Sequence, residues 1–563
     1  MPLLDLYLNE RRRRFKAEVN RMTGGGMEAL LADEPERSDL GFLLGYLHAF
    51  HWLQRNVPAR YRPPLLAPFK GGSRAFLMEL LQESPDAETF LQRYIAHWDA
   101  AGTATGPVQQ AQLQRLLQAR GGDRGRLVSD LLAIWKRLGL FSRPDTVAYS
   151  EIGRRERNRY DGMLSDPDRE RLAMVDQLPD PSAETGHFEK LGVIPAMGCP
   201  QACRHCMFIW RPPMAGLQAP AGLYELLEAH TRSLLFTGGD LTHHLAHFHR
   251  AIRTMRRITT FAILLNGDFA TTPGETRRVL GAMTGALRQR PAGWPTAHIL
   301  LQISFDEFHQ EVIVDRDGRL KERIPVARIA NIVEAAVRHP EIQLALLHKQ
   351  NHLNFSMDLF HKGVFGRLAA ELAARGHQLR ILSTTPSTRH KENPLQPGAL
   401  APLIRDAGFV LTRHPERPVL LTSSTIDAYG RAQLLEPGEA VNDRPLLAEV
   451  LERGPPAGEA FDTDLMFWFN GWVTLFSAVH IALGNLSSER PETIFARHRK
   501  DPLTRALRGF DRRLLTCYNE VRPDLERQIE RATGPHQLFH ALTEEADVRL
   551  HMTRRLIESQ ETT

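Results

Sequence analysis

Short apolar runs alternate with longer helical patterns through the middle of this chain, and this alternation limits the possible folds more than any other feature. The apolar runs are "KLGVIPA", "SLLFTGGD", "TTFAILLNGD", "AHILLQISFD", "IQLALLHK" and "QLRILSTT". Amphipathic segments such as "GETRRVLGAMTGALRQ" and "RIANIVEAAVRH" separate them. The six pairings between Leu191 and about Thr385 predict a parallel α/β sheet or barrel, whose chemistry gathers at the carboxyl ends of the strands.

The regions on either side of this core have a different pattern. Residues 1–176 contain successive helical patterns, such as "SDLGFLLGYLHAFHWLQRN", and predict an all-α N-terminal domain. The polar, proline-bearing stretch 177–189 predicts a linker to the core at 190–385. Residues 386–563 predict an α+β C-terminal extension, in which "PERPVLLTSST" indicates a strand and "FWFNGWVTLFSAVHIALGN" a hairpin that turns at Asn470-Gly471.

Composition excludes several classes of partner. The 71 Lys and Arg residues exceed the 66 Asp and Glu residues by only five, and basic runs such as "TMRRITT" are scattered among acids, so no nucleic-acid partner is expected. No apolar run approaches the length of a membrane span. At the N-terminus charge follows a short apolar stretch, the reverse of a signal peptide. With few, clustered cysteines, these features predict a cytoplasmic protein.

Three of the four cysteines, Cys199, Cys203 and Cys206, lie within eight positions of "IPAMGCPQACRHCMF", directly after the first predicted strand. A structural zinc ion takes four ligands, and the nearest fourth candidate, His205, is awkwardly placed between Arg204 and Cys206. A [4Fe–4S] cluster normally takes four thiolates, so three leave one iron without a cysteine ligand. The position after a strand favours the cluster; zinc and incidental thiols remain the alternatives.

This cysteine spacing resembles the signature of the radical S-adenosylmethionine (SAM) superfamily, whose core is a partial (β/α)6 barrel. The resemblance covers about 190–385. The glycines and the acid of "LLFTGGDLT" resemble the family's Gly-Gly-Glu element, which holds the amino group of SAM, with Asp in place of Glu. The resemblance implies cofactor contacts for His205, Phe208, Gly238, Gly239, Asp240, Asn266, Ser304 and Asp306. For Ser304 and Asp306, capping of the following helix is the alternative.

The implied cofactors are a [4Fe–4S] cluster and SAM, which chelates the open iron through its amino and carboxylate groups. One electron then breaks a C–S bond of SAM, and the 5′-deoxyadenosyl radical abstracts a hydrogen atom from the substrate. The resemblance also implies oxygen sensitivity and an external electron donor of flavodoxin or ferredoxin type. The C-terminal extension resembles the SPASM and twitch extensions but lacks their cysteines, which predicts a single cluster.

Several other side chains are candidates for chemistry at the predicted rim. His309 and Glu311 follow the fourth predicted strand, and His348 and His352 follow the fifth. Substrate contact or proton transfer is one role for them, and solvation at the rim is the other. Cys517 is either a hydrogen donor to a substrate radical or a buried helix cysteine. The histidines of "THHLAHFHR" suggest a second metal site less well than a helix face, because no carboxylate or cysteine accompanies them.

The resemblance therefore implies a radical SAM enzyme, and with it a tailoring step on a peptide or secondary metabolite, as in natural product biosynthesis. The N-terminal helices are expected to recognise that substrate. Methyl or aminocarboxypropyl transfer by a radical SAM enzyme is one alternative. A non-catalytic iron–sulfur or zinc-binding protein that recruits partners is the other.

Overall fold

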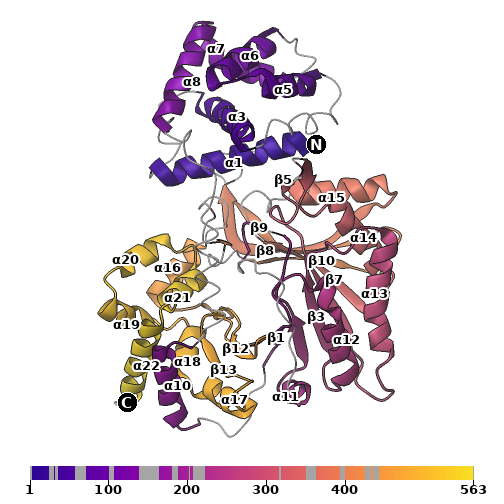
Figure 1. Ribbon diagram of the computed structural model, residues 1–563, viewed down its shortest axis with the longest axis vertical. Helices are drawn as coiled ribbons and strands as arrows, with labels where there is room; N and C mark the ends of the chain where they lie inside the picture. The colour runs from indigo at the N-terminus through magenta and orange to yellow at the C-terminus, as the bar shows by residue number, and fades with distance from the viewer. Residues whose placement is uncertain are drawn as a thin grey trace. The chain divides into compact units, whose positions relative to one another are not determined.

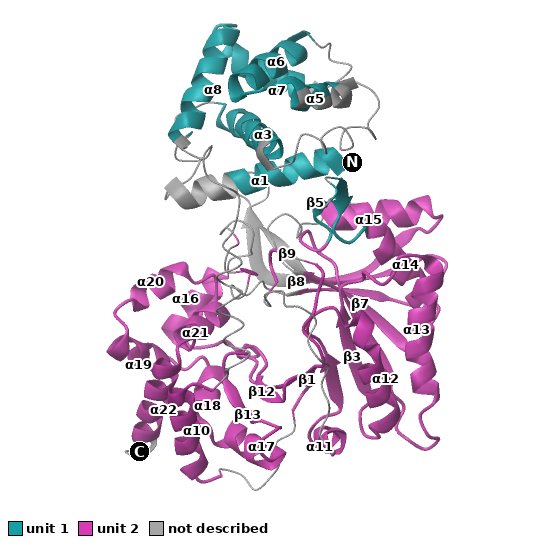
Figure 2. Ribbon diagram, in the orientation of Figure 1, with its two compact units in different colours: residues 1–147, 310–325, 436–439 teal, residues 148–309, 326–435, 440–563 magenta. Residues whose placement is uncertain are grey.

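Contacts divide the chain into two compact units in the computed structural model (Figures 1 and 2). The first unit contains residues 1–147, 310–325 and 436–439, and the second contains 148–309, 326–435 and 440–563. The structure describes residues 3–23, 31, 36–56, 72–100, 107–138, 164–180, 188–201, 203–206, 222–315, 317, 319–349, 363–392, 400–424, 431–432, 435 and 443–561.

The first unit is helical, as predicted, with an aromatic core. Its helices are α1 (Leu3–Thr23), α3 (Arg37–Asn56), α5 (Gly72–Glu83), α6 (Ala87–Ala100), α7 (Pro107–Gln118) and α8 (Arg124–Leu138). In the core the ring of Phe15 stacks on His48 at 4.7 Å and lies 5.8 Å from Trp135. A two-stranded sheet, β5 (Val312–Val314) and β6 (Leu320–Glu322), packs on α1. The stretch 310–325, predicted within the α/β core, thus joins the helical unit instead.

One large sheet organises the second unit. It has eleven strands in the order β13-β12-β11-β1-β2-β3-β4-β7-β10-β9-β8. Their bounds are β1 (Leu191–Ile194), β2 (Ser233–Phe236), β3 (Thr260–Leu265), β4 (His298–Ser304), β7 (Ile342–Lys349), β8 (Leu379–Glu392), β9 (Leu400–Leu411), β10 (Val419–Ser424), β11 (Leu465–Trp468), β12 (Trp472–Leu475) and β13 (Ala482–Asn485). The strands β1, β2, β3, β4, β7 and β10 are parallel neighbours in chain order. Their carboxyl ends therefore lie along one sheet edge.

The predicted α/β class with parallel strands is confirmed, but two details differ. The sheet is open, with β13 and β8 as its outer strands, so the described strands do not close into a barrel. The sixth parallel strand is also not the predicted one. The run at 378–385 forms part of β8, which pairs antiparallel with β9, and β10 takes the sixth parallel position beside β7. The α/β core thus extends beyond residue 385.

Helices pack along the parallel strands, as the strand–helix alternation predicts (Figure 1). They are α11 (Leu223–His230), α12 (Leu245–Thr254), α13 (Pro273–Arg288), α14 (Val326–Ala336) and α15 (Gly363–Ala374), with a 3₁₀ turn η2 (Leu241–His244) before α12. The start of α13 shows how the sequence sets a helix boundary. Thr272 Oγ1 accepts the N–H of Glu275 at 3.1 Å, and Pro273 occupies the first turn. A threonine cap followed by proline favours this position for a helix start.

The C-terminal region extends the sheet and adds a helical layer. The predicted hairpin is confirmed: β11 and β12 pair antiparallel, and Gly471 adopts a φ of 86° in the turn. The strand β11 also pairs in parallel with β1, so the extension continues the core sheet. The helices of this region are α16 (Arg444–Arg453), which precedes β11, and α17 (Pro491–Lys500), α18 (Pro502–Arg508), α19 (Arg513–Val521), α20 (Leu525–Arg531), α21 (Pro535–Leu542) and α22 (Ala546–Glu561), which follow the hairpin.

Helix α10 (Asp166–Gln177) belongs to this C-terminal layer, although the sequence pattern groups it with the N-terminal helices. It packs on α17 and α22. Two buried ion pairs fix it there: Arg171 to Asp501 at 2.9 Å, and Arg549 to Asp168 at 2.8 Å. Such pairs, between residues more than 300 positions apart, leave no local signal in the sequence.

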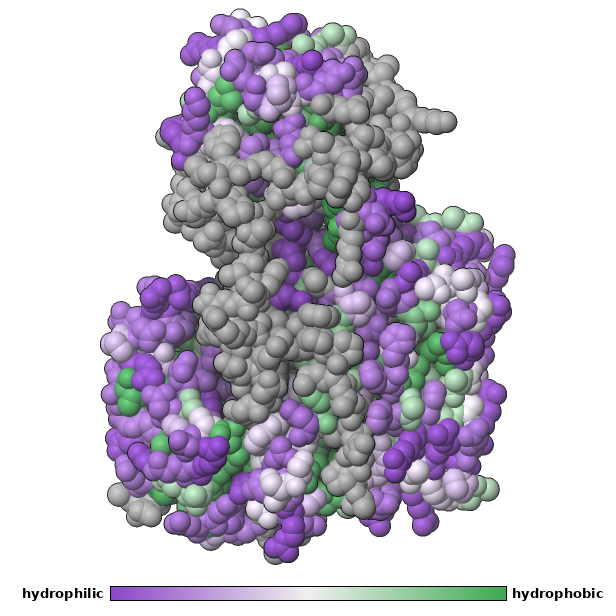
Figure 3. All heavy atoms as spheres, in the orientation of Figure 1, coloured by the Kyte–Doolittle hydropathy of each residue, from purple (hydrophilic) through white to green (hydrophobic). Residues whose placement is uncertain are grey.

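No helix in the described part of the chain is long and apolar enough to cross a membrane. On the face shown in Figure 3, hydrophilic side chains predominate and the hydrophobic ones form separate areas between them. The hydrophobic residues of the sheet strands are instead largely buried.

Candidate functional site

The loop after β1 carries the three clustered cysteines at the carboxyl edge of the parallel strands, as predicted. Cys203 is buried, Cys199 and Cys206 are half-buried, and none of the three forms a disulfide. The N–H of Cys206 donates to the carbonyl of Cys203 at 3.3 Å, which turns the loop back on itself. The sulfur atoms of these three cysteines do not all lie within 4.8 Å of one another. A single zinc ion with Zn–S bonds of about 2.3 Å would hold its thiolates roughly 3.8 Å apart.

The Gly-Gly-Asp segment after β2 packs directly against the stretch that leads into the cysteine loop. The N–H of Gly239 donates to Ala196 O at 3.2 Å, and the N–H of Asp240 donates to Gly198 O at 2.7 Å. A Cβ on Gly239 would lie 2.3 Å from Gly198 O, too close for any side chain. Gly238 has a φ of 132° and is similarly crowded by Ala196 O. The glycines therefore permit a close approach of two loops, in addition to the approach to a ligand expected from the sequence.

One of the charged groups near Cys199 is Arg431, which no sequence pattern indicates. The pKa of Cys199 is raised to about 11, mainly by burial; Cys206 and Asp240 also raise it, whereas a hydrogen bond from the Gln201 backbone and the charge of Arg431 lower it. Arg431 is buried, and its backbone N–H donates to the carbonyl of Cys206 at 2.9 Å. Arg431 follows the sixth parallel strand. Because it lies far from the cysteines in the sequence, no local pattern predicts this contact. Binding of a metal to Cys199 must therefore displace a proton.

The loop after β4 meets the cysteine loop in a cluster of three polar side chains: His205, Asp306 and His309. Asp306 Oδ2 lies 3.4 Å from His205 Nε2 and 3.0 Å from His309 Nδ1. Asp306 Oδ1 accepts the N–H groups of Phe308 and His309, both at 2.9 Å, and lies 3.1 Å from His309 Nδ1. These three form the one group within the described chain whose potential metal-ligand atoms all lie within 4.8 Å of one another.

Electrostatics keep this cluster anionic at its centre. Burial raises the pKa of Asp306, but the charges and hydrogen bonds of His309 and His205 outweigh it and hold the pKa well below its ordinary value. The fully buried His348, at the end of β7, is within electrostatic reach of the same carboxylate. Burial lowers the pKa of His348 to about 4, so that its ring is neutral near pH 7. His309 and His348, predicted at the ends of the fourth and fifth strands, thus both lie near the Asp306 carboxylate. The remaining predicted residues are described below.

Asn266 and Ser304 occupy the predicted strand ends. Asn266 is buried after β3, where its Oδ1 accepts the N–H of Asp268 at 2.8 Å. Its Nδ2 has no hydrogen-bond partner among the described residues, so a buried donor is available to a ligand. Ser304 is the last residue of β4 and pairs in register with Leu347 of β7.

Four sets of predicted residues lie elsewhere or cannot be placed. Glu311 lies in the first unit, where its buried carboxylate pairs with Arg14 and, at 2.8 Å, with Arg323. Cys517 is buried on α19, which packs among α20, α21 and α22, and burial raises the pKa of its thiol. Phe208 and His352 lie outside the described residues. The histidines at 243, 244, 247 and 249 lie on η2 and α12 and form no compact ligand group in the described chain.

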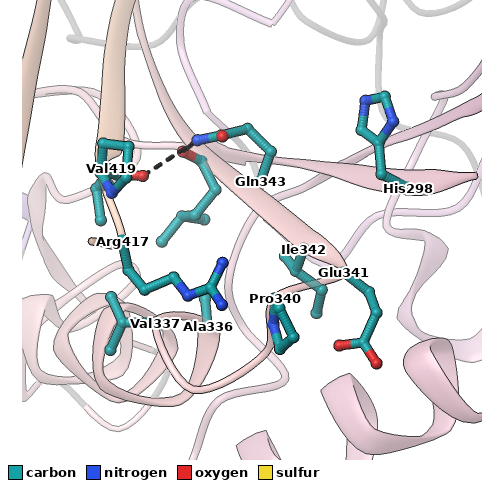
Figure 4. A pocket seen from close by; sticks show the side chains of 11 residues that line it. His298, Ala336, Val337, Pro340, Glu341, Ile342, Gln343, Arg417 and Val419 are labelled. Carbon is teal, nitrogen blue, oxygen red and sulfur yellow. Dashed lines mark hydrogen bonds between the residues drawn. The ribbon is translucent and has the colours of Figure 1, made fainter. Parts of the chain in front are cut away.

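A pocket in the second unit lies at the opposite edge of the sheet (Figure 4). His298 begins the strand β4, Glu341 and Gln343 lie at the start of β7, and Arg417 precedes β10. Gln343 Nε2 donates to Pro418 O at 3.1 Å across it. Because these are the amino ends of the parallel strands, the pocket is separate from the cysteine loop.

No family model matches the sequence, and neither does any curated protein. What the protein does therefore has to be inferred from its own residues.

Proposed function

We propose that the protein is a radical SAM enzyme. The observation that carries the proposal is the contact between the loops after β1 and β2. The three-cysteine loop follows the first of six parallel strands, and the Gly-Gly-Asp segment after the second lies against it through two backbone hydrogen bonds. Six parallel strands in chain order are what a partial (β/α)6 barrel requires, and we propose that this part of the open sheet corresponds to that core.

The cysteine loop fits an iron–sulfur cluster better than a single ion. Its three sulfur atoms do not all lie within 4.8 Å of one another, whereas one tetrahedral zinc ion would hold its thiolates roughly 3.8 Å apart; a cubane has one iron per thiolate. Three thiolates leave the fourth iron open to a non-protein ligand. When bound, the cluster supplies the electron that cleaves the C–S bond of SAM and starts radical chemistry on the substrate.

The residues beside this loop suit SAM. Asp240 is buried next to Cys199 and offers a carboxylate to the amino group of the methionine part. Its Oδ1 already accepts Thr242 Oγ1–H at 2.6 Å, which holds the carboxylate in place. Asn266 offers its buried Nδ2 donor, and Ser304 lies at the next strand end. Arg431 adds a positive charge near Cys199, which favours a carboxylate ligand there.

The substrate class follows from the superfamily resemblance rather than from a contact. We propose a tailoring reaction on a peptide or a secondary metabolite, with an external flavodoxin- or ferredoxin-type electron donor and a cytoplasmic location. His348, near Asp306 at the end of β7, remains our candidate for contact with the substrate. The contacts of Glu311 and Cys517 are instead those of an internal ion pair and a packed helix cysteine.

Turnover of SAM tests this function. The full-length protein, reconstituted anaerobically with iron and sulfide and reduced with dithionite, is expected to convert SAM to 5′-deoxyadenosine and methionine, measured by chromatography with mass detection. A protein-free mixture with the same iron, sulfide and dithionite is the control. Production of 5′-deoxyadenosine no faster than in that control would instead favour a non-catalytic metal-binding protein.

A further inference from the structure

We propose that His205, Asp306 and His309 form a second metal site, which binds one divalent transition-metal ion such as Zn²⁺ or Fe²⁺. The proposal goes beyond the radical SAM assignment and does not depend on it, because none of these residues is a ligand of the iron–sulfur cluster. His205 comes from the loop after β1, and Asp306 and His309 come from the loop after β4.

The Asp306 carboxylate is oriented so that one oxygen faces both imidazoles. Its Oδ1 is held by the backbone N–H groups of Phe308 and His309, each at 2.9 Å. This anchoring directs Oδ2 toward His309 Nδ1, at 3.0 Å, and His205 Nε2, at 3.4 Å. Ligands held by a second set of hydrogen bonds are a regular feature of protein metal sites.

The separations of the ligand atoms fit an ion placed between them. Bonds of about 2.1 Å, with angles between about 90° and 109°, put neighbouring ligand atoms roughly 3.0 to 3.4 Å apart. The two distances from Asp306 Oδ2 span this interval. The alternative is a purely hydrogen-bonded cluster. The usual N–H···O distance is about 2.9 to 3.0 Å, so the hydrogen bond between His205 and Asp306, at 3.4 Å, is a long one.

Asp306 and His205 are buried and His309 is half-buried, and ring contacts hold His205 in place before any ion binds. The ring of His205 stacks on Phe308 at 4.7 Å with 13° between the planes, and it meets His309 edge-on at 4.7 Å. Asp306 is completely buried. A buried carboxylate is costly unless a positive charge compensates it, and a divalent cation supplies that charge.

Two imidazoles and one carboxylate suit zinc and ferrous iron rather than magnesium or calcium, which prefer oxygen ligands. Three protein ligands also leave at least one coordination position for water or a substrate. The expected ligand of the ion is therefore an oxygen of the substrate, such as a carboxylate or carbonyl, held at the same sheet edge as the cysteine loop.

Cobalt(II) binding tests the proposal without relying on activity. The full-length Cys199→Ala/Cys203→Ala/Cys206→Ala variant is titrated with Co²⁺, so that the cluster cysteines cannot take up the ion. We expect one equivalent to bind, with the visible absorption bands of ligand-bound cobalt. Adding Asp306→Asn keeps an oxygen for the two backbone N–H groups but removes the charge. Because losing even an outer-shell partner weakens metal binding by about 10- to 100-fold, we expect a loss of about 100-fold or more.

His309→Cys in the same background, which lacks the three loop cysteines, supplies a positive signal. If residue 309 is a ligand, the new thiolate must add an intense sulfur-to-cobalt band in the near ultraviolet. The control variant His243→Ala/His244→Ala/His247→Ala removes histidines of η2 and α12 and must leave the stoichiometry unchanged. Cobalt binding unaffected by Asp306→Asn, or a His309→Cys variant without the sulfur band, would overturn the proposal and leave a hydrogen-bonded cluster. Circular dichroism checks the fold of each variant, and His309→Cys decides if Asp306→Asn does not fold.

Discussion

Replacing Cys203 by alanine is expected to abolish cluster assembly and reductive cleavage of SAM together. Cys203 is the buried member of the three cysteines, and the turn from its carbonyl to the N–H of Cys206 positions the loop. Without its thiolate, one of three irons loses its protein ligand and the cubane has only two anchors. We expect iron to fall from about four atoms per chain to a small fraction, with loss of the brown colour. The rate of 5′-deoxyadenosine formation should fall to that of the protein-free mixture.

Cys517→Ala is the matched control for iron content, because it removes the remaining cysteine from a helix in the same unit. It is expected to bind as much iron and sulfide as the unmodified protein. A Cys203→Ala variant that kept its iron and its SAM cleavage would refute the assignment of the cysteine loop.

Gly239→Ala is expected to lower SAM cleavage by roughly 100-fold while the protein still folds. The added Cβ would lie 2.3 Å from Gly198 O, 2.7 Å from its carbonyl carbon and 2.8 Å from its nitrogen, all backbone atoms that cannot rotate away. The loops after β1 and β2 must therefore separate, and the hydrogen bond from the Asp240 N–H to Gly198 O is lost or lengthened. Displacing reacting groups by about 1 Å commonly costs about 100-fold in rate. The rate of 5′-deoxyadenosine formation measures the effect.

Gly281→Ala is the control for this substitution. Gly281 lies on α13, and a Cβ there meets nothing within 4 Å. Alanine at an open helix position is expected to stabilise the protein by about 1 kcal/mol and to leave SAM cleavage unchanged. Equal rates in the Gly239→Ala and Gly281→Ala variants would show that the contact between the two loops is not needed for the reaction.

Much of the site can be predicted from the sequence because its residues follow recognisable strands. Cys199, Gly239 and Asn266 each come just after an apolar run of strand length, and parallel strands bring such loops to one edge. Strand positions therefore predict the neighbourhood without any knowledge of long-range contacts. The same reasoning places Ser304 and His348 at the ends of β4 and β7.

The features that escape prediction depend on partners far away in the sequence. Both "QLRILSTT" and "PERPVLLTSST" have the composition of a strand, and only the pairing of Leu420 with Ala345 decides which becomes the sixth parallel strand. The short strands β5 and β6 interrupt the strand–helix series and pack on α1, which no local pattern indicates. Arg431 contacts the cysteine loop from more than 200 positions away.

The cluster around Asp306 shows the limit most clearly. Sequence patterns indicate His205, Asp306 and His309 individually, but assign them to SAM or to the substrate. Their convergence depends on about 100 intervening residues that fold into β2, β3, β4 and their helices. The distances of 3.0 and 3.4 Å from the Asp306 carboxylate, which suggest a metal site, arise only from that fold.

Electron paramagnetic resonance of the reduced protein tests most directly whether a cluster iron is open to SAM. Anaerobically reconstituted protein is reduced with dithionite, and spectra are recorded before and after SAM is added. The account predicts the signal of a reduced [4Fe–4S] cluster whose g values change with SAM, because its amino and carboxylate groups bind the iron that lacks a cysteine. Zinc in place of iron, or a cluster signal that SAM leaves unchanged, would contradict the account.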